Sequence, residues 1–229
     1  MLVIGKVFRA AVAVCAVAAF AGCSSDDAPD PDKTVISVDT VRNALLKAAE
    51  IGPTWAAPEE SAAPGQLVSI CGADTAAVAI PGSPTLVSAP LADEGSKGAQ
   101  SLTQHGLVYQ DAVDAVTSVA SLRTVADACP PTTAKPAKTG DREEPSYTET
   151  AATTDLNEGD WVGFVTVRNK LYDPAHPATA DVAVVVLAKG NVVLVDQYAI
   201  YRLGASNASA NPQFSADWKK LVATTLKRL

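Results

Sequence analysis

An unbroken apolar run at residues 182–187 constrains the fold of this chain more than any other segment. Successive side chains of a strand point to opposite faces of the sheet, so a strand that is apolar at every position must be covered on both faces. The run is followed by Lys189, Gly190 and Asn191, which give a tight-turn signal ahead of another apolar segment. The sequence therefore predicts a hairpin whose first strand lies at the centre of a sheet.

The remaining periodic segments predict three helices and a group of strands. Apolar residues recur at helical spacing in residues 38–49, 111–129 and 215–229. Strands are expected at residues 102–110, 146–156, 161–171, 181–189 and 191–203. The short apolar runs at residues 67–71 and 76–80 are expected to be two short strands, or a strand and a turn. The Pro- and Lys-rich residues 130–145 are expected to form an exposed loop. This order indicates a single α+β domain in which helices pack on an antiparallel sheet.

The helix expected at residues 111–129 has the clearest start of the three. Asp111 is expected to cap it, and Asp114 places a second negative charge in the first turn, where exposed amides and the helix dipole favour it. The apolar stripe that should face the core consists of Val113, Val116, Val119, Ala120, Leu122, Val125 and Ala126.

The first 23 residues are typical of a bacterial lipoprotein signal. Lys6 and Arg9 precede an apolar run at residues 10–20, which is too short for a membrane-spanning helix of about 20 residues. Two small residues then precede Cys23, which fits cleavage after residue 22 and attachment of diacylglycerol to Cys23. An ordinary signal peptide that ends near a cysteine, or a hydrophobic N-terminal helix, is the alternative, and Phe20 departs from the leucine usual there.

These features predict three parts of the chain. Residues 1–22 would be the signal peptide, residues 23–36 a flexible tether and residues 37–229 one folded domain. The tether is expected because residues 24–33 are rich in Ser, Asp and Pro and almost free of apolar side chains. The lipid would hold such a protein on the outer face of the cell membrane, so the membrane is its first expected partner.

Two of the four cysteines are left for the folded domain. Cys15 lies within the predicted signal and Cys23 is the predicted lipidation site, which leaves Cys71 and Cys129. An even pair in an oxidising compartment predicts a disulfide. Two free thiols or a metal site are the alternatives, although two cysteines and two distant histidines make a poor ligand set. We expect neither a metal nor a cofactor.

The charge of the chain argues against nucleic acid as a partner. Loss of Lys6 and Arg9 with the signal leaves 16 basic and 25 acidic residues, a formal charge of −9. An acidic protein lacks the basic surface that binds phosphate backbones or anionic membranes. The same charge also keeps a secreted domain soluble, so it identifies no partner by itself.

Several positions together resemble a known family. A helix followed by Gly52, Pro53 and Trp55, then Cys71, then a helix whose last turn carries Cys129, resembles the extracellular sensor domains of mycobacterial protein kinase H and related actinobacterial lipoproteins. The hairpin sequence at residues 181–198, DVAVVVLAKGNVVLVDQY, is also similar to that family.

The resemblance covers about residues 35–229 and implies a curved antiparallel sheet flanked by helices, with a cleft that takes an unidentified ligand. Domains of this family often have a second disulfide, for which this chain has no cysteines left. The family supplies no catalytic residues.

The sequence offers little for catalysis. There is no GxSxG motif, and the two histidines lie apart, with His105 in an expected strand and His176 in a Pro-rich loop. The adjacent carboxylates of Glu143 and Glu144 are most simply part of a solvated charge run. We therefore expect no catalytic residues.

Four polar residues within apolar strands are candidates for ligand binding. Arg168 lies in one strand, and Asp196, Tyr198 and Arg202 share a face of the last strand. If these faces line a cleft, the four could orient a polar group. The alternatives are that they lie at sheet edges or toward solvent, or that they pair with one another.

The sequence favours a lipid-anchored extracytoplasmic domain that binds a ligand or an envelope protein without catalysis. A carrier of lipid or glycolipid is the alternative, and it would require a dry cavity of several hundred cubic ångströms. An envelope hydrolase is a third hypothesis, and it would need ionisable side chains that converge in a cleft.

Overall fold

The computed structural model describes residues 35–58, 67–72, 79–95, 98–137, 144–204 and 212–229. These belong to one compact unit, Thr34–Leu229. The predicted signal peptide, Cys23 and most of the predicted tether lie outside the described residues. None of the helices in the described ranges is both long and apolar enough to cross a membrane.

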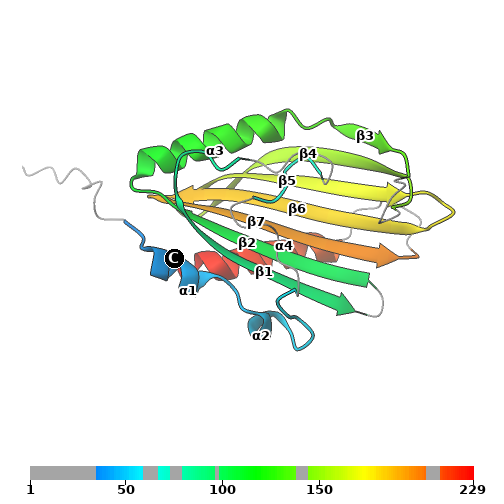
Figure 1. Ribbon diagram of the computed structural model, residues 1–229, viewed down its shortest axis with the longest axis horizontal. Helices are drawn as coiled ribbons and strands as arrows, with labels where there is room; N and C mark the ends of the chain where they lie inside the picture. The colour runs from blue at the N-terminus through cyan, green and yellow to red at the C-terminus, as the bar shows by residue number, and fades with distance from the viewer. Residues whose placement is uncertain (1–34, 59–66, 73–78, 96–97, 138–143, 205–211) are drawn as a thin grey trace, which may run out of the picture. The chain divides into compact units, whose positions relative to one another are not determined.

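One antiparallel sheet of seven strands dominates the described structure (Figure 1), in the order β1-β2-β7-β6-β5-β4-β3. The strands are β1 Thr85–Gly95, β2 Gly98–Val108, β3 Thr132–Lys135, β4 Tyr147–Glu158, β5 Trp161–Tyr172, β6 Ala178–Lys189 and β7 Val192–Leu203. With the helices described below, this sheet confirms the α+β prediction. The run at residues 182–187 lies in β6, the central strand, and the expected hairpin joins β6 to β7.

Helices cover both faces of the sheet, as the apolar central strand requires. The helix α3 (Ala112–Asp127) lies on one face, which we call the α3 face, and α4 (Pro212–Leu226) on the other, together with α1 (Val38–Ala44) and α2 (Ala48–Ile51). Val182, Val184 and Val186 of β6 belong to the cluster beneath α3. Val185 and Leu187 belong to the cluster that includes residues of α1 and α4.

The buried side of α3 agrees with the predicted stripe at Leu122 and Ala126 but differs from it in the first turns. Val113 and Val116 are 73% and 64% exposed, whereas Ala115 and Ser118 are fully buried along with Leu122. The hydroxyl group of Ser118 accepts a hydrogen bond from Tyr109, at 2.7 Å. Small residues let a helix approach a sheet closely. The less hydrophobic Ala115 and Ser118 are therefore buried here, and the more hydrophobic Val113 and Val116 are exposed. The Asp111 cap is confirmed, because its Oδ1 accepts from the Asp114 amide at 2.9 Å.

Both edge strands were missed by the sequence prediction. β1 carries Pro90, which a central strand would not tolerate but an edge strand accepts, since one row of its amides has no partner strand. β3 lies within the expected loop 130–145 and pairs with β4 at the other edge. Residues 67–71 were expected to be a strand but have no regular secondary structure, and most of the expected strand at residues 76–80 lies outside the described residues.

The helix expected at residues 38–49 is interrupted at the buried residues Leu45 and Leu46, which separate α1 from α2. A side chain from the sheet takes the place of the missing helical hydrogen bonds. Gln104, fully buried on β2, accepts from the Leu46 amide at 3.0 Å and donates to the Leu46 carbonyl at 3.1 Å. A glutamine that satisfies both groups stabilises a break that the apolar periodicity could not reveal.

The start of the folded unit is fixed at the β6–β7 turn. The Ile36 amide donates to Asn191 Oδ1 at 2.8 Å, and Asn191 Nδ2 donates to the carbonyls of Ile36 and Tyr109 at 3.2 and 2.9 Å. The chain therefore enters the unit beside this turn, at the end of the sheet where α3 begins (Figure 1).

Candidate functional site

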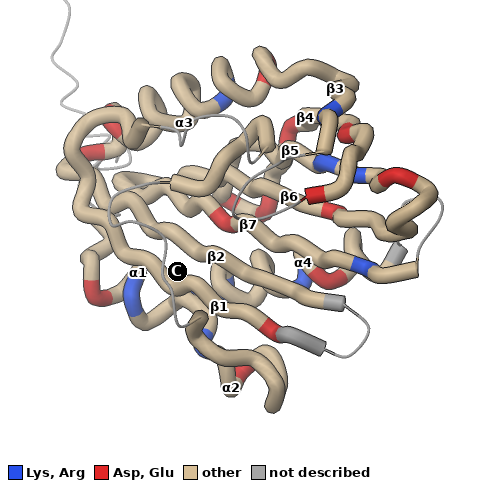
Figure 2. The backbone as a smooth tube through the Cα atoms, turned by 45° about the vertical axis from the view of Figure 1, so that its right-hand side comes forward, with Lys and Arg blue, Asp and Glu red and all other residues tan. Residues whose placement is uncertain are grey.

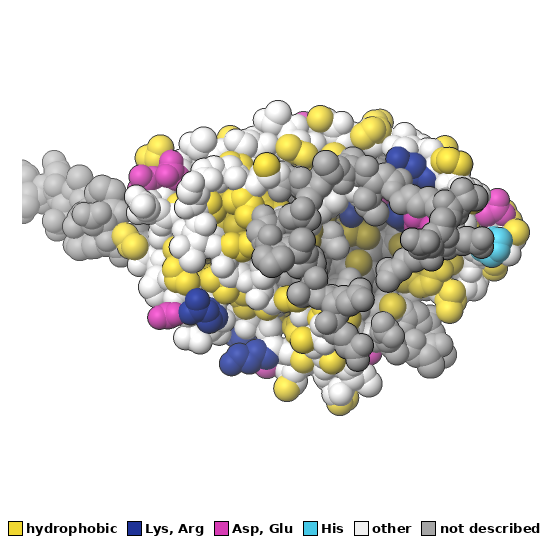
Figure 3. Space-filling model, in the orientation of Figure 1, with side chains coloured by type: hydrophobic (Ala, Val, Ile, Leu, Met, Phe, Trp, Pro, Cys, Tyr) yellow, Lys and Arg dark blue, Asp and Glu magenta, His cyan; other side chains and the backbone are white. Residues whose placement is uncertain are grey.

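The α3 face is covered unevenly. Under α3 the strands present apolar side chains such as Phe164, Val184 and Val193. Farther along the same strands, toward the end of β5, the side chains become polar. Charged residues of both signs gather there on β4 and β5 (Figure 2), and the space-filling view shows Lys and Arg side chains on this face (Figure 3).

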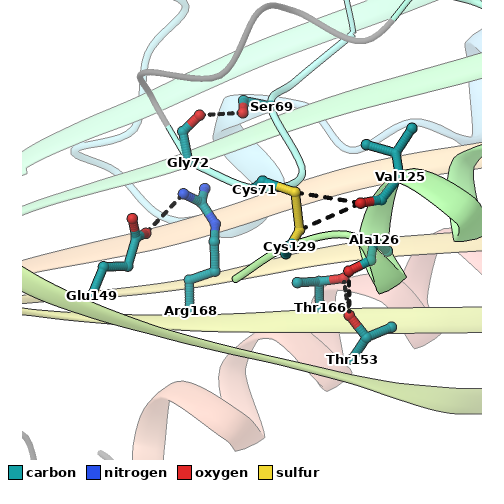
Figure 4. Close-up of a disulfide and its surroundings, with 10 residues drawn as sticks. All are labelled: Ser69, Cys71, Gly72, Val125, Ala126, Cys129, Glu149, Thr153, Thr166 and Arg168. Atoms are coloured by element: carbon teal, nitrogen blue, oxygen red, sulfur yellow. Dashed lines mark hydrogen bonds and ion pairs between the residues drawn. A yellow bond between two sulfur atoms is a disulfide. The ribbon is translucent and has the colours of Figure 1, made fainter. Parts of the chain in front are cut away.

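A disulfide holds an irregular segment over this polar region. Cys71 is bonded to Cys129, which follows α3, with a Cα–Cα distance of 5.2 Å (Figure 4). This confirms the disulfide predicted from the sequence. The bond fixes residues 67–72 against the end of α3 and so places them above the strands.

Residues of the segment and of the strands line an open cavity of about 420 Å³. Its walls come from residues 67–69 and from four adjacent strands of the sheet. The lining residues are Leu67, Val68, Ser69, Thr103, His105, Arg168, Lys170, Tyr172, Ala180, Val182 and Gln197. We call this space the α3-face cavity.

A buried ion pair forms part of the floor. Arg168 Nη1 on β5 lies 2.9 Å from Glu149 Oε1 on β4, and the two side chains are 5% and 6% exposed. Burial lowers the pKa of the Arg168 guanidinium, and the negative charge of Glu149 opposes this shift. Arg168 Nε is buried and has no hydrogen-bond partner within the described part of the chain.

Gly72 lies directly over this ion pair (Figure 4). A Cβ atom at this position would come within 2.9 Å of Glu149 Oε2 and 3.1 Å of Arg168 Nη1. Its φ of +119° is also outside the range that other residues adopt readily. Position 72 therefore needs glycine for both space and backbone conformation. Through this glycine the backbone next to the disulfide lies against the ion pair in the cavity floor.

A second charged group lies beside the first. Lys170 Nζ is 3.3 Å from Glu144 Oε1, which also accepts a hydrogen bond from the Tyr172 hydroxyl at 3.0 Å. The Lys170 ammonium lies 4.0 Å from the centre of the Tyr147 ring, a cation–π contact. Burial and the hydrogen bond to Glu144 raise the pKa of Tyr172, which stays protonated. Each cation of the cavity thus has a carboxylate partner.

His105 lines the cavity but is a poor candidate for a catalytic base. Its Nδ1 is 2.7 Å from Ser88 Oγ, and burial lowers its pKa to about 4. A general base works best with a pKa near the working pH. Among the described residues no carboxylate contacts His105, and no group of three metal-binding side chains is present.

The four residues predicted to bind a ligand do not lie together. Arg168 lies on the α3 face, in the floor of the cavity. Tyr198 and Asp196 lie on the opposite face, where Tyr198 stacks on Phe214 at 5.7 Å and donates to Gln100 at 2.8 Å. Arg202 pairs with Asp181 at 2.9 Å. Whether any of the four binds a ligand stays a prediction.

Asp196 has no part in the cavity but is unusual in its burial. It is 4% exposed, and its Oδ1 has no hydrogen-bond partner among the described residues. Burial raises its pKa to about 7. The carboxyl group therefore carries a proton through part of the range in which an exposed aspartate is charged.

The sequence indicated Arg168, which lines the cavity, but not its neighbours there. A signal for Lys170 and Tyr172 was present, because they follow Arg168 at the two-residue spacing of one strand face. Nothing in the sequence indicates Glu149 or Gln197. Only the order of the strands in the sheet brings Glu149 beside Arg168 and places Gln197 in the lining of the same cavity.

Comparison with known proteins supports the fold. No family model matches the chain, and no curated protein matches it. Among solved structures, it is similar to the crystal structure of the extracellular domain of PknH from Mycobacterium tuberculosis, with 14% sequence identity and a TM-score of 0.52. The match covers 85% of this chain and 98% of that chain. At this identity the similarity shows the fold alone, which agrees with the fold implied by the sequence resemblance.

The buried ion pair yields a stability prediction. Glu149→Ala should lower the free energy of unfolding by about 3–5 kcal/mol, because it leaves a buried guanidinium without its partner. The double change Glu149→Leu with Arg168→Met should cost much less, since no buried charge remains. Urea unfolding measures both.

The control is Asp155→Ala, which removes an exposed partner of Arg123 and should cost less than about 1 kcal/mol. Equal costs for the single and double changes would contradict this account.

Asp196 yields a prediction about pH. Its pKa in the folded state, about 7, lies above the ordinary value of 3.8, so the native state binds more protons between these values. The favourable contribution of Asp196 to the free energy of unfolding is therefore present in full below about pH 4 and is lost as the pH rises through about 7. Asp196→Asn should stabilise the protein at pH 8 relative to the unsubstituted chain, by as much as about 4 kcal/mol, and by less at pH 5.

Denaturant titrations at the two pH values measure this difference. Asp160→Asn is the control, because its side chain is 86% exposed. A gain from Asp196→Asn that is the same at both pH values would show that Asp196 does not titrate as described.

Proposed function

We propose that this protein is a lipid-anchored binding or sensor domain on the outer face of the cell membrane and that it recognises its ligand without catalysing a reaction. The α3-face cavity carries this proposal. Its volume lies in the range of small-molecule sites, and its lining combines apolar walls with a few converging polar groups.

The chemistry of the lining favours a small polar ligand. Arg168 and Lys170 are each paired with a carboxylate, so the cavity has little net charge to attract a strong anion. Thr103 and Gln197 add a hydroxyl and an amide group. A carrier of acyl chains would need a dry, apolar interior, so this lining supports the carrier hypothesis less well.

We propose that the protein is not a catalyst because the protonation of His105 does not suit a general base. With a pKa lowered to about 4, its imidazole is neutral and weakly basic near pH 7. The carboxylates near the cavity, Glu144 and Glu149, are already paired with cations. A hydrolase would need at least one of these groups to be available.

The location is proposed on two grounds. The N-terminal sequence has the features of a lipoprotein signal that ends before Cys23. The fold is similar to that of an extracellular domain, and a disulfide of the kind seen here persists in oxidising compartments.

The anchor is tested by Cys23→Ala in cells. The variant should remain uncleaved or be released from the membrane, because the lipid attachment site is lost. Membrane fractionation and the intact mass of the product measure both outcomes. Cys15→Ala, within the predicted signal, is the control and should be processed normally. A cleaved Cys23→Ala product retained on the membrane would contradict the anchor.

The ligand is tested by native mass spectrometry of residues 24–229 purified from an actinobacterial host. A discrete bound mass is expected, and Ala180→Phe should abolish it by filling the α3-face cavity. The matched control is Ala152→Phe, an exposed alanine on β4 that does not line the cavity. A ligand-free mass for the unsubstituted protein, or a bound mass that survives Ala180→Phe, would contradict this site.

A further inference from the structure

Large apolar side chains are exposed together at one end of the described unit. Val35, Val113, Val116 and Val162 are 60–73% exposed. Val116 and Val162 line the same groove, of about 490 Å³, between α3, the start of β5 and the end of β6. Exposed apolar side chains that gather in this way mark an interaction surface more often than single exposed ones do.

The chain enters the folded unit at this same end. Ile36 is bonded to Asn191, and Gly190, the preceding residue of the turn, lines the apolar groove. Val35 is the chain neighbour of Ile36 and so lies near the same turn. We call Val35, Val113, Val116 and Val162 together the apolar end. In Figure 1 the first described residues, the start of α3 and the β6–β7 turn lie together at one end of the sheet.

The length of chain before residue 35 limits how far the apolar end can lie from Cys23. Eleven residues, 24–34, separate Cys23 from the described unit. Fully extended, they would reach at most about 40 Å, and a flexible chain of this length spans about 18 Å on average. If Cys23 carries lipid, the apolar end is the part of the domain tied closest to the bilayer.

We propose that the apolar end docks on the lipid bilayer to which the protein is anchored, with Val113, Val116 and Val162 in the interfacial region. The proposal rests on the lipid anchor of the proposed function. A short tether raises the effective concentration of a linked site to the order of millimolar. Even a small apolar surface with weak affinity is then occupied for much of the time.

The charges around the apolar end indicate which lipids it suits. Asp111, Asp114 and Asp160 lie at its rim, with Arg123 and Lys189 as the neighbouring cations. Acidic side chains do not attract anionic headgroups. Apolar contact therefore drives the docking, and zwitterionic phosphatidylcholine is a sufficient surface.

The test anchors the protein chemically. Residues 23–229 are prepared with the Cys71–Cys129 disulfide intact, so that Cys23 has the remaining thiol, and Cys23 is coupled to a maleimide lipid in phosphatidylcholine vesicles. Val116→Trp then reports contact with brominated acyl chains through quenching of its fluorescence. Leu203→Trp is the matched control, because Leu203 is 63% exposed but lies at the opposite end of β7 from the turn. Emission of the chain without added Trp is subtracted from both.

Brominated lipids should reduce the added emission of Val116→Trp at least twofold and leave that of Leu203→Trp unchanged. Val113→Asp with Val162→Asp should restore the emission of Val116→Trp, since both positions are exposed and the fold does not depend on them. Equal quenching at the two ends, no quenching at either, or no response to the aspartates would overturn the proposal. A dimer of the uncoupled chain that Val113→Asp dissociates would instead assign the apolar end to a second copy.

This result is independent of natural lipidation. Failure of the anchor would appear in the Cys23→Ala fractionation, whereas failure of docking would appear here in a protein that is anchored by design. Loss of ligand binding in the α3-face cavity would affect neither measurement.

Discussion

The arrangement of the helices depends on the central strand β6, because its six successive apolar side chains must be covered on both faces of the sheet. The helices meet this requirement unequally. On one face, α1 packs against β1 and β2 and α4 against β7. Val185 and Leu187 of β6 belong to the same apolar cluster, and Tyr198 and even the polar Asp196 are buried on this face. On the other face, α3 covers the apolar part of the strands and ends before their polar part. The α3-face cavity is the space that this unequal coverage leaves.

A polar cavity floor within a sheet is stable only if its charges are paired. Arg168 and Glu149 on neighbouring strands are each desolvated, and neither could be buried alone without a large cost. The disulfide and Gly72 complete the arrangement, because they place backbone against the ion pair where an ordinary side chain would not fit. The same contacts that shield the pair from water also shape the cavity wall, so local stability and cavity shape are set by the same few residues.

The sequence predicted the strands and helices whose apolar pattern is strong, and it failed where small, polar or paired residues decide the packing. The β6–β7 hairpin and the disulfide followed from the residues themselves. The predicted stripe on α3 was right at Leu122 and Ala126, which are buried, but wrong at Val113 and Val116, which are exposed. In the first turns of α3 the buried residues are instead Ala115 and Ser118, which hydrophobicity ranks low. β1 was missed because its alternation is weak and it carries Pro90, which only its edge position allows. Glu149 could not be linked to Arg168 before the strand order was known.

The two surfaces that distinguish this domain lie at opposite ends of the α3 face. Val162, at the apolar end, and Lys170, in the cavity, are eight residues apart on β5, or about 26 Å along an extended strand. If the apolar end rests on the bilayer, the α3-face cavity lies well above the lipid headgroups. A cavity in that position is suited to ligands from the space outside the membrane. A lipid carrier that extracts its cargo from the bilayer would instead need the opening of its binding cavity near the apolar end. Half of the residues that line the groove there are valine or alanine, and the polar groups of the α3-face cavity lie at the other end of β5.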